Sequence, residues 1–269
     1  MIGIRALLEY LSLRKLKLRA GQIASLLRDP HVTVYPRVLE FDTPRRAKQD
    51  VLVLTPHADD ETFGAGGTII RHLECGDDVQ VILFSDNVSS VEGGESSREE
   101  IVRMREDEFA CAMRVLGVRH WKALRLGNRS FDDGVYPGHA FSDLIENHRD
   151  VLYLPSLFDN HHDHRVLNVW LLRTLAEHIA MRPLIRGYEV WSPLPATVVT
   201  DISNQMPRKR EAMRCYHSQI AAIDYPHHIE GLNAYRAMTL GGRSARHAEA
   251  FFEFSADAYL ELGNSLLVS

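Results

Sequence analysis

Short apolar runs alternate with longer stretches of helical periodicity through most of the chain. The runs at residues 50–55 and 79–85 carry few polar positions, as strands buried on both faces do, and further short strands are predicted at 121–126, 151–154 and 187–191. The longer stretches repeat apolar positions at helical spacing, and they cover residues 62–75, 96–116, 166–181 and 208–217. This alternation predicts an α/β fold, with a mostly parallel sheet and helices on both of its faces.

Residues 1–30 differ from the rest of the chain in charge. Six basic residues against two acidic ones give this segment +4, whereas the whole chain carries -5. Its apolar residues recur at roughly helical spacing, so we expect an amphipathic helix, and its charges interrupt any signal-peptide core. Two interpretations stay open: a basic helix lying on anionic lipid, or a helix packed against the domain. The predicted organisation is a basic, helical N-terminal extension at residues 1–45 and a single α/β domain at 46–269.

Composition excludes several classes of protein. A net charge of -5 does not suit a nucleic-acid partner, and no apolar run approaches the roughly 18 residues of a membrane span. Cys75, Cys111 and Cys215 are far apart and odd in number, which fits neither a disulfide framework nor a thiolate metal site. We therefore expect a cytoplasmic protein, with residues 1–30 as the segment for peripheral contact with the inner face of the membrane. The sequence carries no signal for an oligomeric state.

Two clusters of ionisable residues follow predicted strands. Residues 56–61 place a histidine and three acids after the first strand, and residues 159–164 place three histidines and two acids after the strand at 151–154. Either cluster alone is also typical of a polar loop whose histidines cap helices. Because the carboxyl ends of parallel strands meet at one edge of a sheet, the two together favour a shared metal site. Imidazole and carboxylate ligands suit Zn²⁺, and Fe²⁺ or Co²⁺ also accept them.

The same residues resemble the motifs of a known family. His57-Ala58-Asp59-Asp60-Glu61, with the glycines at 64, 66 and 67, resembles the His-Pro-Asp-Asp-Glu…Gly-Gly signature of the PIG-L / LmbE-like de-N-acetylases. His161-His162-Asp163-His164 resembles the family's His-x-Asp-His motif, and residues 105–118 are similar to its Arg-x-x-Glu helix. The resemblance spans roughly residues 50–255 and implies a Rossmann-like fold. Ala58 stands where the family usually has proline, and Tyr216 where many members have histidine.

The resemblance also implies roles for the residues of the first two motifs. His57, Asp60 and His164 match the metal ligands, and Asp59 matches the general base that takes a proton from the attacking water. His161 is the candidate that binds the oxyanion of the tetrahedral intermediate. Either His161 or Asp59 would protonate the leaving amine, and both alternatives stay open.

Further roles concern the surroundings of the metal. Asp163 is expected to assist catalysis by orienting a neighbouring histidine, and Glu61 to brace the first loop. Arg105 matches the family's substrate-binding arginine, although a salt bridge on a charged helix explains an arginine there equally well. The glycines at residues 64–67 lack the spacing of a phosphate-binding loop, so we interpret them as a site of close helix packing.

Together these expectations describe a zinc-dependent amidohydrolase. It would hydrolyse the acetamido group of an N-acetylglucosamine-like sugar or glycoconjugate and release acetate and a free amine. Two alternatives are a metal-dependent phosphoesterase and a non-catalytic sugar-binding protein of the same fold. A single ligand triad counts against the first, and the intact Asp59 counts against the second.

Overall fold

A computed structural model describes residues 36–41, 48–88, 97–127, 131, 136–138, 141, 145, 149–178, 182–241 and 244–267, without the side chains of 265 and 267. The basic segment at 1–30 lies outside these ranges, so the helix expected there stays a prediction. None of the helices within the described ranges is long and apolar enough to cross a bilayer.

The described residues build an eight-stranded sheet in the order β1-β7-β8-β6-β5-β2-β3-β4. Its strands are β1 (Arg37–Val38), β2 (Asp50–Thr55), β3 (Asp78–Ser85), β4 (His120–Leu126), β5 (Val151–Pro155), β6 (Leu184–Tyr188), β7 (Val198–Asp201) and β8 (Ala248–Phe254). All pairings are parallel except those of β8, which runs antiparallel to β6 and β7. The prediction of a mostly parallel sheet is confirmed. β1 lies within the segment 1–45 that the sequence analysis separated from the domain.

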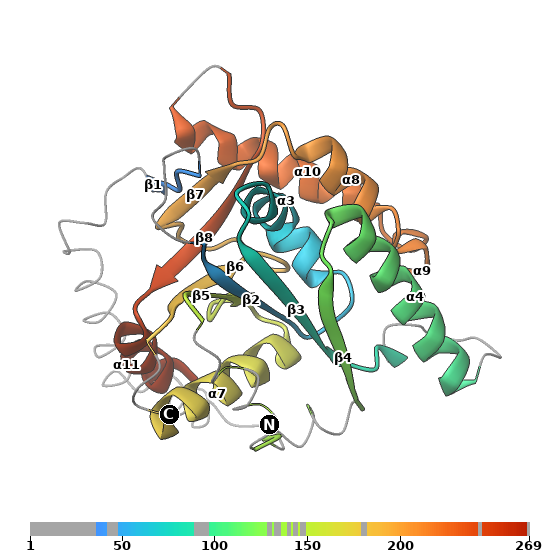
Figure 1. Cartoon of the computed structure of the whole chain (residues 1–269), viewed down its shortest axis with the longest axis horizontal. Coiled ribbons are helices and arrows are strands. Elements are labelled where there is room, and N and C mark those ends of the chain that lie inside the picture. Colours follow the sequence, from blue (N-terminus) through green and yellow to red (C-terminus); the bar gives the residue numbers. More distant parts are fainter. Residues whose placement is uncertain are drawn as a thin grey trace, which may run out of the picture.

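Helices cover both faces of this sheet (Figure 1). One layer packs into a first hydrophobic core and contains α3 (Asp60–Glu74), α4 (Arg98–Leu116), α8 (Met206–Met213) and α10 (Tyr225–Arg236). The opposite layer packs into a second core and contains α7 (His162–Glu177) and α11 (Ala256–Leu267). The short α9 (His217–Ile220) and the 3₁₀ helix η2 (Ala237–Leu240) flank α10. The expected two-sided arrangement is therefore confirmed.

The strand order reverses beside β2. The chain adds β3 and β4 on one side of β2, and then returns to place β5 on its other side. The loops that leave β2 and β5 consequently turn in opposite directions, which opens a crevice at the carboxyl edge of the sheet. In doubly wound α/β folds, ligands bind at this switch point.

Several predicted boundaries are wrong, two of them at residues whose polar side chains have specific partners in the folded chain. α7 begins at His162 rather than at 166, because the His161 side chain caps the helix by accepting from the Asp163 N–H. β6 covers residues 184–188 rather than 187–191, because Arg186 and Glu253 are paired across β6 and β8 and form an ion pair at 2.8 Å. α8 ends at Met213 instead of continuing to 217. The strands β7 and β8 and the helices α10 and α11 were not predicted.

The glycines behind the first polar loop allow close packing. A Cβ atom on Gly64 would lie 2.8 Å from the carbonyl oxygen of Glu189, and one on Gly67 would lie 2.7 Å from Ile202. Any larger residue would push α3 away from its neighbours, because both contacts are shorter than normal van der Waals distances. The observed contacts agree with the predicted packing role of this run.

A disulfide joins Cys111 of α4 to Cys215, which follows α8, and their Cα atoms are 5.8 Å apart. The expectation that the cysteines form no disulfide is therefore wrong. The two residues are separated by 104 positions in the sequence, and only the packing of α4 against α8 brings them together.

A buried ion pair ties α3 to the elements around it. The Lys209 ammonium group donates to Glu249 Oε1 at 2.7 Å, to Asn233 Oδ1 at 2.8 Å and to the Phe63 carbonyl at 2.7 Å. The Glu249 carboxylate also accepts from two N–H groups of α3, those of residues 67 and 68. Both charged side chains are fully buried, so each depends on its partner for solvation.

We expect Lys209→Met to lower the free energy of unfolding by about 3–5 kcal/mol, because it leaves the buried Glu249 carboxylate without its counter-ion. The measurement is urea unfolding. The matched control is the double variant Lys209→Met/Glu249→Gln, which removes both charges and should recover a large part of the loss. A single variant as stable as the natural protein would contradict this account.

Candidate active site

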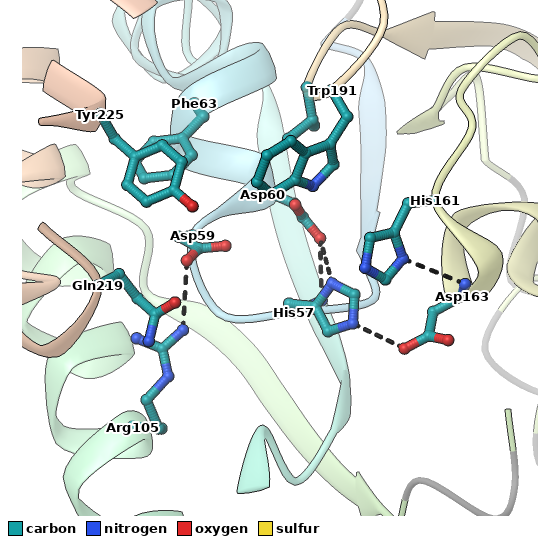
Figure 2. Close-up of a pocket in the computed structure, with 11 residues that line it drawn as sticks. His57, Asp59, Asp60, Phe63, Arg105, His161, Asp163, Trp191, Gln219 and Tyr225 are labelled. Carbon is teal, nitrogen blue, oxygen red and sulfur yellow. Dashed lines mark hydrogen bonds and ion pairs between the residues drawn. The ribbon is translucent and has the colours of Figure 1, made fainter. Parts of the chain in front are cut away.

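The two polar clusters of the sequence meet at the carboxyl edge of the sheet. Residues 56–61 follow β2, and residues 156–164 follow β5 and enter α7. The two strands pair in parallel, so their ends lie side by side. Both clusters line a pocket of about 230 Å³ at the switch point beside β2 (Figure 2).

Three candidate ligands converge on one another. The Asp60 Oδ2 atom lies 3.1 Å from His57 Nδ1 and 3.1 Å from His164 Nε2. Donor atoms that share one Zn²⁺ at bond lengths of about 2.0–2.1 Å have a similar spacing, so these residues fit a small divalent cation. The ring nitrogens of His57, His161 and His164 also lie within 4.8 Å of one another, which makes His161 an alternative third ligand.

Two further carboxylates lie next to the ring nitrogens of His57 and His164 that do not face Asp60. The Asp163 Oδ2 atom lies 2.8 Å from His57 Nε2, and the Asp159 Oδ1 atom lies 3.4 Å from His164 Nδ1. Carboxylates in this position orient metal-binding imidazoles and increase their basicity. Asp163 therefore contacts His57, and its orienting role stays a prediction. The sequence analysis gave Asp159 no role, although its place beside the second histidine motif was a usable signal.

Asp59 faces the same pocket without joining the contacts among His57, Asp60 and His164 (Figure 2). Its backbone φ of 136° is a conformation that costs a non-glycine residue about 1–3 kcal/mol. Burial, the largest influence, raises the pKa of its carboxyl group to about 7, while the charge of Arg105 opposes this shift. A carboxylate that titrates near neutral pH suits a general base.

Arg105 lies beneath Asp59 and is fully buried. Its Nη1 atom donates to Glu108 at 2.7 Å and to Ser218 at 3.1 Å. Its Nη2 atom donates to the Ala58 carbonyl at 2.6 Å and to Asp59 Oδ2 at 3.3 Å. These bonds occupy the hydrogens of both terminal nitrogens, so in this structure the guanidinium group positions Asp59. The predicted substrate contact of Arg105 stays a prediction, and it would require one of these bonds to open.

His161 presents a donor to the pocket. Its Nδ1 atom accepts from the Asp163 N–H at 3.2 Å. A neutral imidazole that accepts at Nδ1 carries its proton on Nε2, so the Nε2–H group is available to a substrate oxygen. Burial and then the charges of His164 and His57 lower the pKa of His161, which favours this neutral form.

Glu61 braces the first loop from inside the protein. It accepts from the Asp59 N–H at 3.3 Å and from the Tyr216 hydroxyl at 2.6 Å. Burial raises the pKa of the Tyr216 hydroxyl well above its usual value, so the group stays protonated and serves as a donor. The tyrosine that departs from the family pattern therefore supports the loop rather than lining the pocket.

Asn87 supplies a support that no sequence motif indicated. The N–H group of Ala58 donates to Asn87 Oδ1 at 2.8 Å, and Asn87 Nδ2 donates to the Ser85 carbonyl at 3.1 Å. Proline, the residue usual in the family signature, has no N–H group and could not make the first bond. In this chain the side chain of Asn87 therefore fixes the peptide group between His57 and Ala58.

We expect Asn87→Gly to lower the free energy of unfolding by about 1–3 kcal/mol, because the buried N–H of Ala58 loses its acceptor. Glycine tolerates the φ of 60° found at this position, so the variant isolates the side chain. Adding Ala58→Pro removes the donor and should recover most of the loss in urea unfolding. Equal stabilities of the single and double variants would contradict this interpretation.

Protons compete with a cation for the histidines. Burial, the largest influence, lowers the pKa of each ring, but hydrogen bonds and charges outweigh it. Asp163 and Asp60 raise the pKa of His57 to about 10, and Asp60 and Asp159 raise that of His164 to about 9. In the metal-free protein these groups stabilise the fold below pH 6.5, and their contribution is lost as the pH rises through about 9 to 10.

Metal affinity should instead increase as the pH rises, because a ligating imidazole must lose its proton. We expect the affinity for Zn²⁺ to rise between pH 6.5 and about 9, by up to about tenfold per pH unit for each proton displaced. Calorimetric titration of the metal-free protein at several pH values measures this slope. A flat profile would mean that neither histidine is a ligand.

The comparisons with known proteins agree with this geometry. The sequence model of the family "GlcNAc-PI de-N-acetylase" (PIG-L) matches residues 52–175. A diacetylchitobiose deacetylase of Thermococcus kodakarensis is 29% identical over 130 residues, which are 47% of this chain and 49% of the relative. The chain thus matches about half the length of that relative.

Two solved structures have similar folds. The N,N'-diacetylchitobiose deacetylase from Pyrococcus horikoshii aligns with a TM-score of 0.65 and 21% identity, covering 89% of this chain and 94% of that one. The 4-carboxy-2-hydroxymuconate hydratase GalB from Pseudomonas putida aligns with a TM-score of 0.63 and 19% identity, covering 76% and 95%. Because these proteins have different activities, the fold alone does not specify the reaction.

Proposed function

Residues 52–175 belong to the PIG-L / LmbE-like family, and from this premise we propose that the protein is a metal-dependent amidohydrolase that deacetylates an N-acetylated amino sugar. The observation that supports it most is the carboxylate of Asp59, which faces the pocket but lies outside the cluster formed by His57, Asp60 and His164. Hydrolysis of an amide at a metal site needs this combination of a ligand set and an unligated base.

The ligand residues are His57, Asp60 and His164, and Zn²⁺ is the proposed ion. Fe²⁺ or Co²⁺ also suit this set of nitrogen and oxygen donors. A bound divalent cation would polarise the amide carbonyl and acidify a water molecule in the pocket. Asp163 and Asp159 keep the two imidazoles oriented during the reaction.

The remaining steps belong to side chains of this chain. Asp59 accepts a proton from the water whose oxygen attacks the carbonyl carbon, and Arg105 holds the Asp59 carboxylate in place. The Nε2–H group of His161 donates to the oxyanion that forms. The carbon–nitrogen bond then breaks, the amine nitrogen takes the proton held by Asp59 or one from His161, and acetate leaves.

Two other functions have less support. A phosphoesterase would need cationic groups for the phosphate, but the only arginine or lysine among the described pocket residues is Arg105, which is already bonded to Asp59 and Glu108. A non-catalytic sugar-binding protein would have no need for a strained, buried Asp59 beside the pocket.

The test combines elemental analysis of the purified protein with acetate release from a panel of N-acetylglucosamine conjugates, with and without a chelator. We expect about one metal ion per chain and acetate release that the chelator abolishes and added Zn²⁺ restores. Bound metal without acetate release from any conjugate would reject the deacetylase proposal. It would then favour a different metal-dependent reaction at the same site. Absence of bound metal would favour a binding protein.

A further inference from the structure

An exposed tryptophan stands at the mouth of the pocket. Trp191 lies beyond the carboxyl end of β6, beside the loop that follows β5, because the two strands are neighbours in the sheet. It lines the pocket, yet 53% of its surface is exposed. Its ring lies 6.5 Å from that of His161 at an angle of 24°, and 6.1 Å from that of Tyr225 at 85° (Figure 2).

Buried polar groups fix the loop that carries this ring. The backbone N–H of Trp191 donates to Asp159 Oδ2 at 3.1 Å, so the carboxylate that lies near His164 Nδ1 also fixes the backbone that carries the tryptophan. Glu189 accepts from the Leu194 N–H at 2.8 Å and forms an ion pair with Arg236, which also donates to the Leu194 carbonyl at 2.7 Å. A large aromatic ring on a backbone fixed in this way is suited to binding a ligand, because little backbone entropy is lost on contact.

The size of the pocket limits how much of a substrate it can enclose. Its volume of about 230 Å³ is below the ~300–1,000 Å³ typical of complete ligand sites. The acetamido group and its own ring can enter, while any group attached to that ring must pass over the rim. Trp191 is the most exposed aromatic side chain among the described residues of this rim.

The charge of the rim favours an uncharged attachment. Outside the proposed metal cluster and its acids, the described lining residues include Val190, Trp191, Gln219 and Tyr225, none of which is charged. The only arginine or lysine of the lining is the buried Arg105, which is bonded to Asp59, so a phosphate or carboxylate on the attached group would find no ionic partner at the rim. The carbon-bound hydrogens of a neutral sugar ring, by contrast, can pack on the face of an indole.

We propose that Trp191 is a stacking platform for a second, neutral sugar ring, joined to the amino sugar that is deacetylated. The proposal rests on the proposed function, and it makes the substrate class a neutral N-acetylated oligosaccharide or glycoside. Trp191 acts as a specificity-determining residue outside the reacting centre.

Kinetics of Trp191 variants test this platform. We expect Trp191→Ala to lower kcat/KM for N,N'-diacetylchitobiose about tenfold, mainly through KM, because one aromatic contact is lost. Activity on N-acetylglucosamine should fall less than activity on the disaccharide, since that substrate has no second ring. Trp191→Phe is the matched control and should keep most of the disaccharide preference. Equal losses on the two sugars would overturn the proposal.

A binding measurement separates this proposal from the deacetylase assignment. Trp191 is more exposed than Trp121, at 37%, and Trp170, at 0%. Titration of the chelator-treated protein with N,N'-diacetylchitobiose should therefore change the tryptophan fluorescence, and Trp191→Phe should abolish that change. This result would support the platform even if no acetate were released. No fluorescence response, or a stronger response to N-acetylglucosamine 1-phosphate, would overturn it.

Discussion

Replacement of Asp59 by asparagine is expected to lower kcat by about 10²–10⁴-fold while the metal content of the protein stays unchanged. Asparagine has nearly the same shape as aspartate, but it cannot accept a proton from the attacking water. The metal is retained because Asp59 takes no part in the contacts between His57, Asp60 and His164. Steady-state kinetics with elemental analysis measures both quantities. Full activity of this variant would show that another group is the base.

The backbone conformation of Asp59 is also expected to affect the stability of the protein. Its φ of 136° is readily available only to glycine. We therefore expect Asp59→Gly to be more stable than Asp59→Ala by about 1 kcal/mol or more, although both are inactive. The comparison isolates the backbone, since both variants lack the carboxylate. Equal midpoints of urea unfolding would mean that the strained conformation carries no cost.

Loss of a direct metal ligand is the second change that we expect to have a large effect, on both metal binding and turnover. Asp60→Ala or His164→Ala should weaken metal binding by more than the about 10–100-fold typical of an outer carboxylate, and should abolish detectable turnover. Asp60 is central because its Oδ2 atom contacts both imidazoles at 3.1 Å. Metal content after dialysis and acetate release provide the measurements.

His161→Ala is the matched control for this set. If His161 donates to the oxyanion, the variant should keep its metal and lose about 10²–10³-fold in kcat. Loss of metal in His161→Ala, with metal retained in Asp60→Ala, would instead identify the three histidines as the ligands. Asp159→Asn, which retains the shape of the outer carboxylate, should weaken metal binding only about 10–100-fold.

The predictable part of the fold follows from a local pattern. β2 was predicted at its observed bounds, and β3 and β5 within a few residues, because the sequence of a parallel strand covered on both faces is a continuous apolar run. The edge strand β4 was also predicted within a few residues, although it is largely exposed. β8 was missed although its burial is comparable, since its sequence contains Glu249 and Glu253. Those charges pair with Lys209 and Arg186, which are distant in the sequence.

The candidate site, like the fold, was predictable only in part. Residue types and their positions after β2 and β5 were sufficient to predict which histidines and acids would meet, because strand ends in a parallel sheet share one edge. The surroundings of these residues were not predictable. Arg105 lies on the same face of α4 as Ile101 and Phe109, but a charged side chain in a charged segment is typical of a surface salt bridge, and only packing places it beneath Asp59.

By itself the sequence determined the α/β class, the family resemblance and the chemical groups that meet at the switch point, since these depend on local periodicity and short motifs. Tertiary structure alone decided the strained backbone of Asp59, the contact of Asn87 with Ala58, the disulfide and the orientation of Trp191. Each of these depends on packing between segments or on backbone angles that the whole fold imposes. Short-range patterns encode neither, because the partners lie tens of residues apart and are selected by the shape of the folded chain.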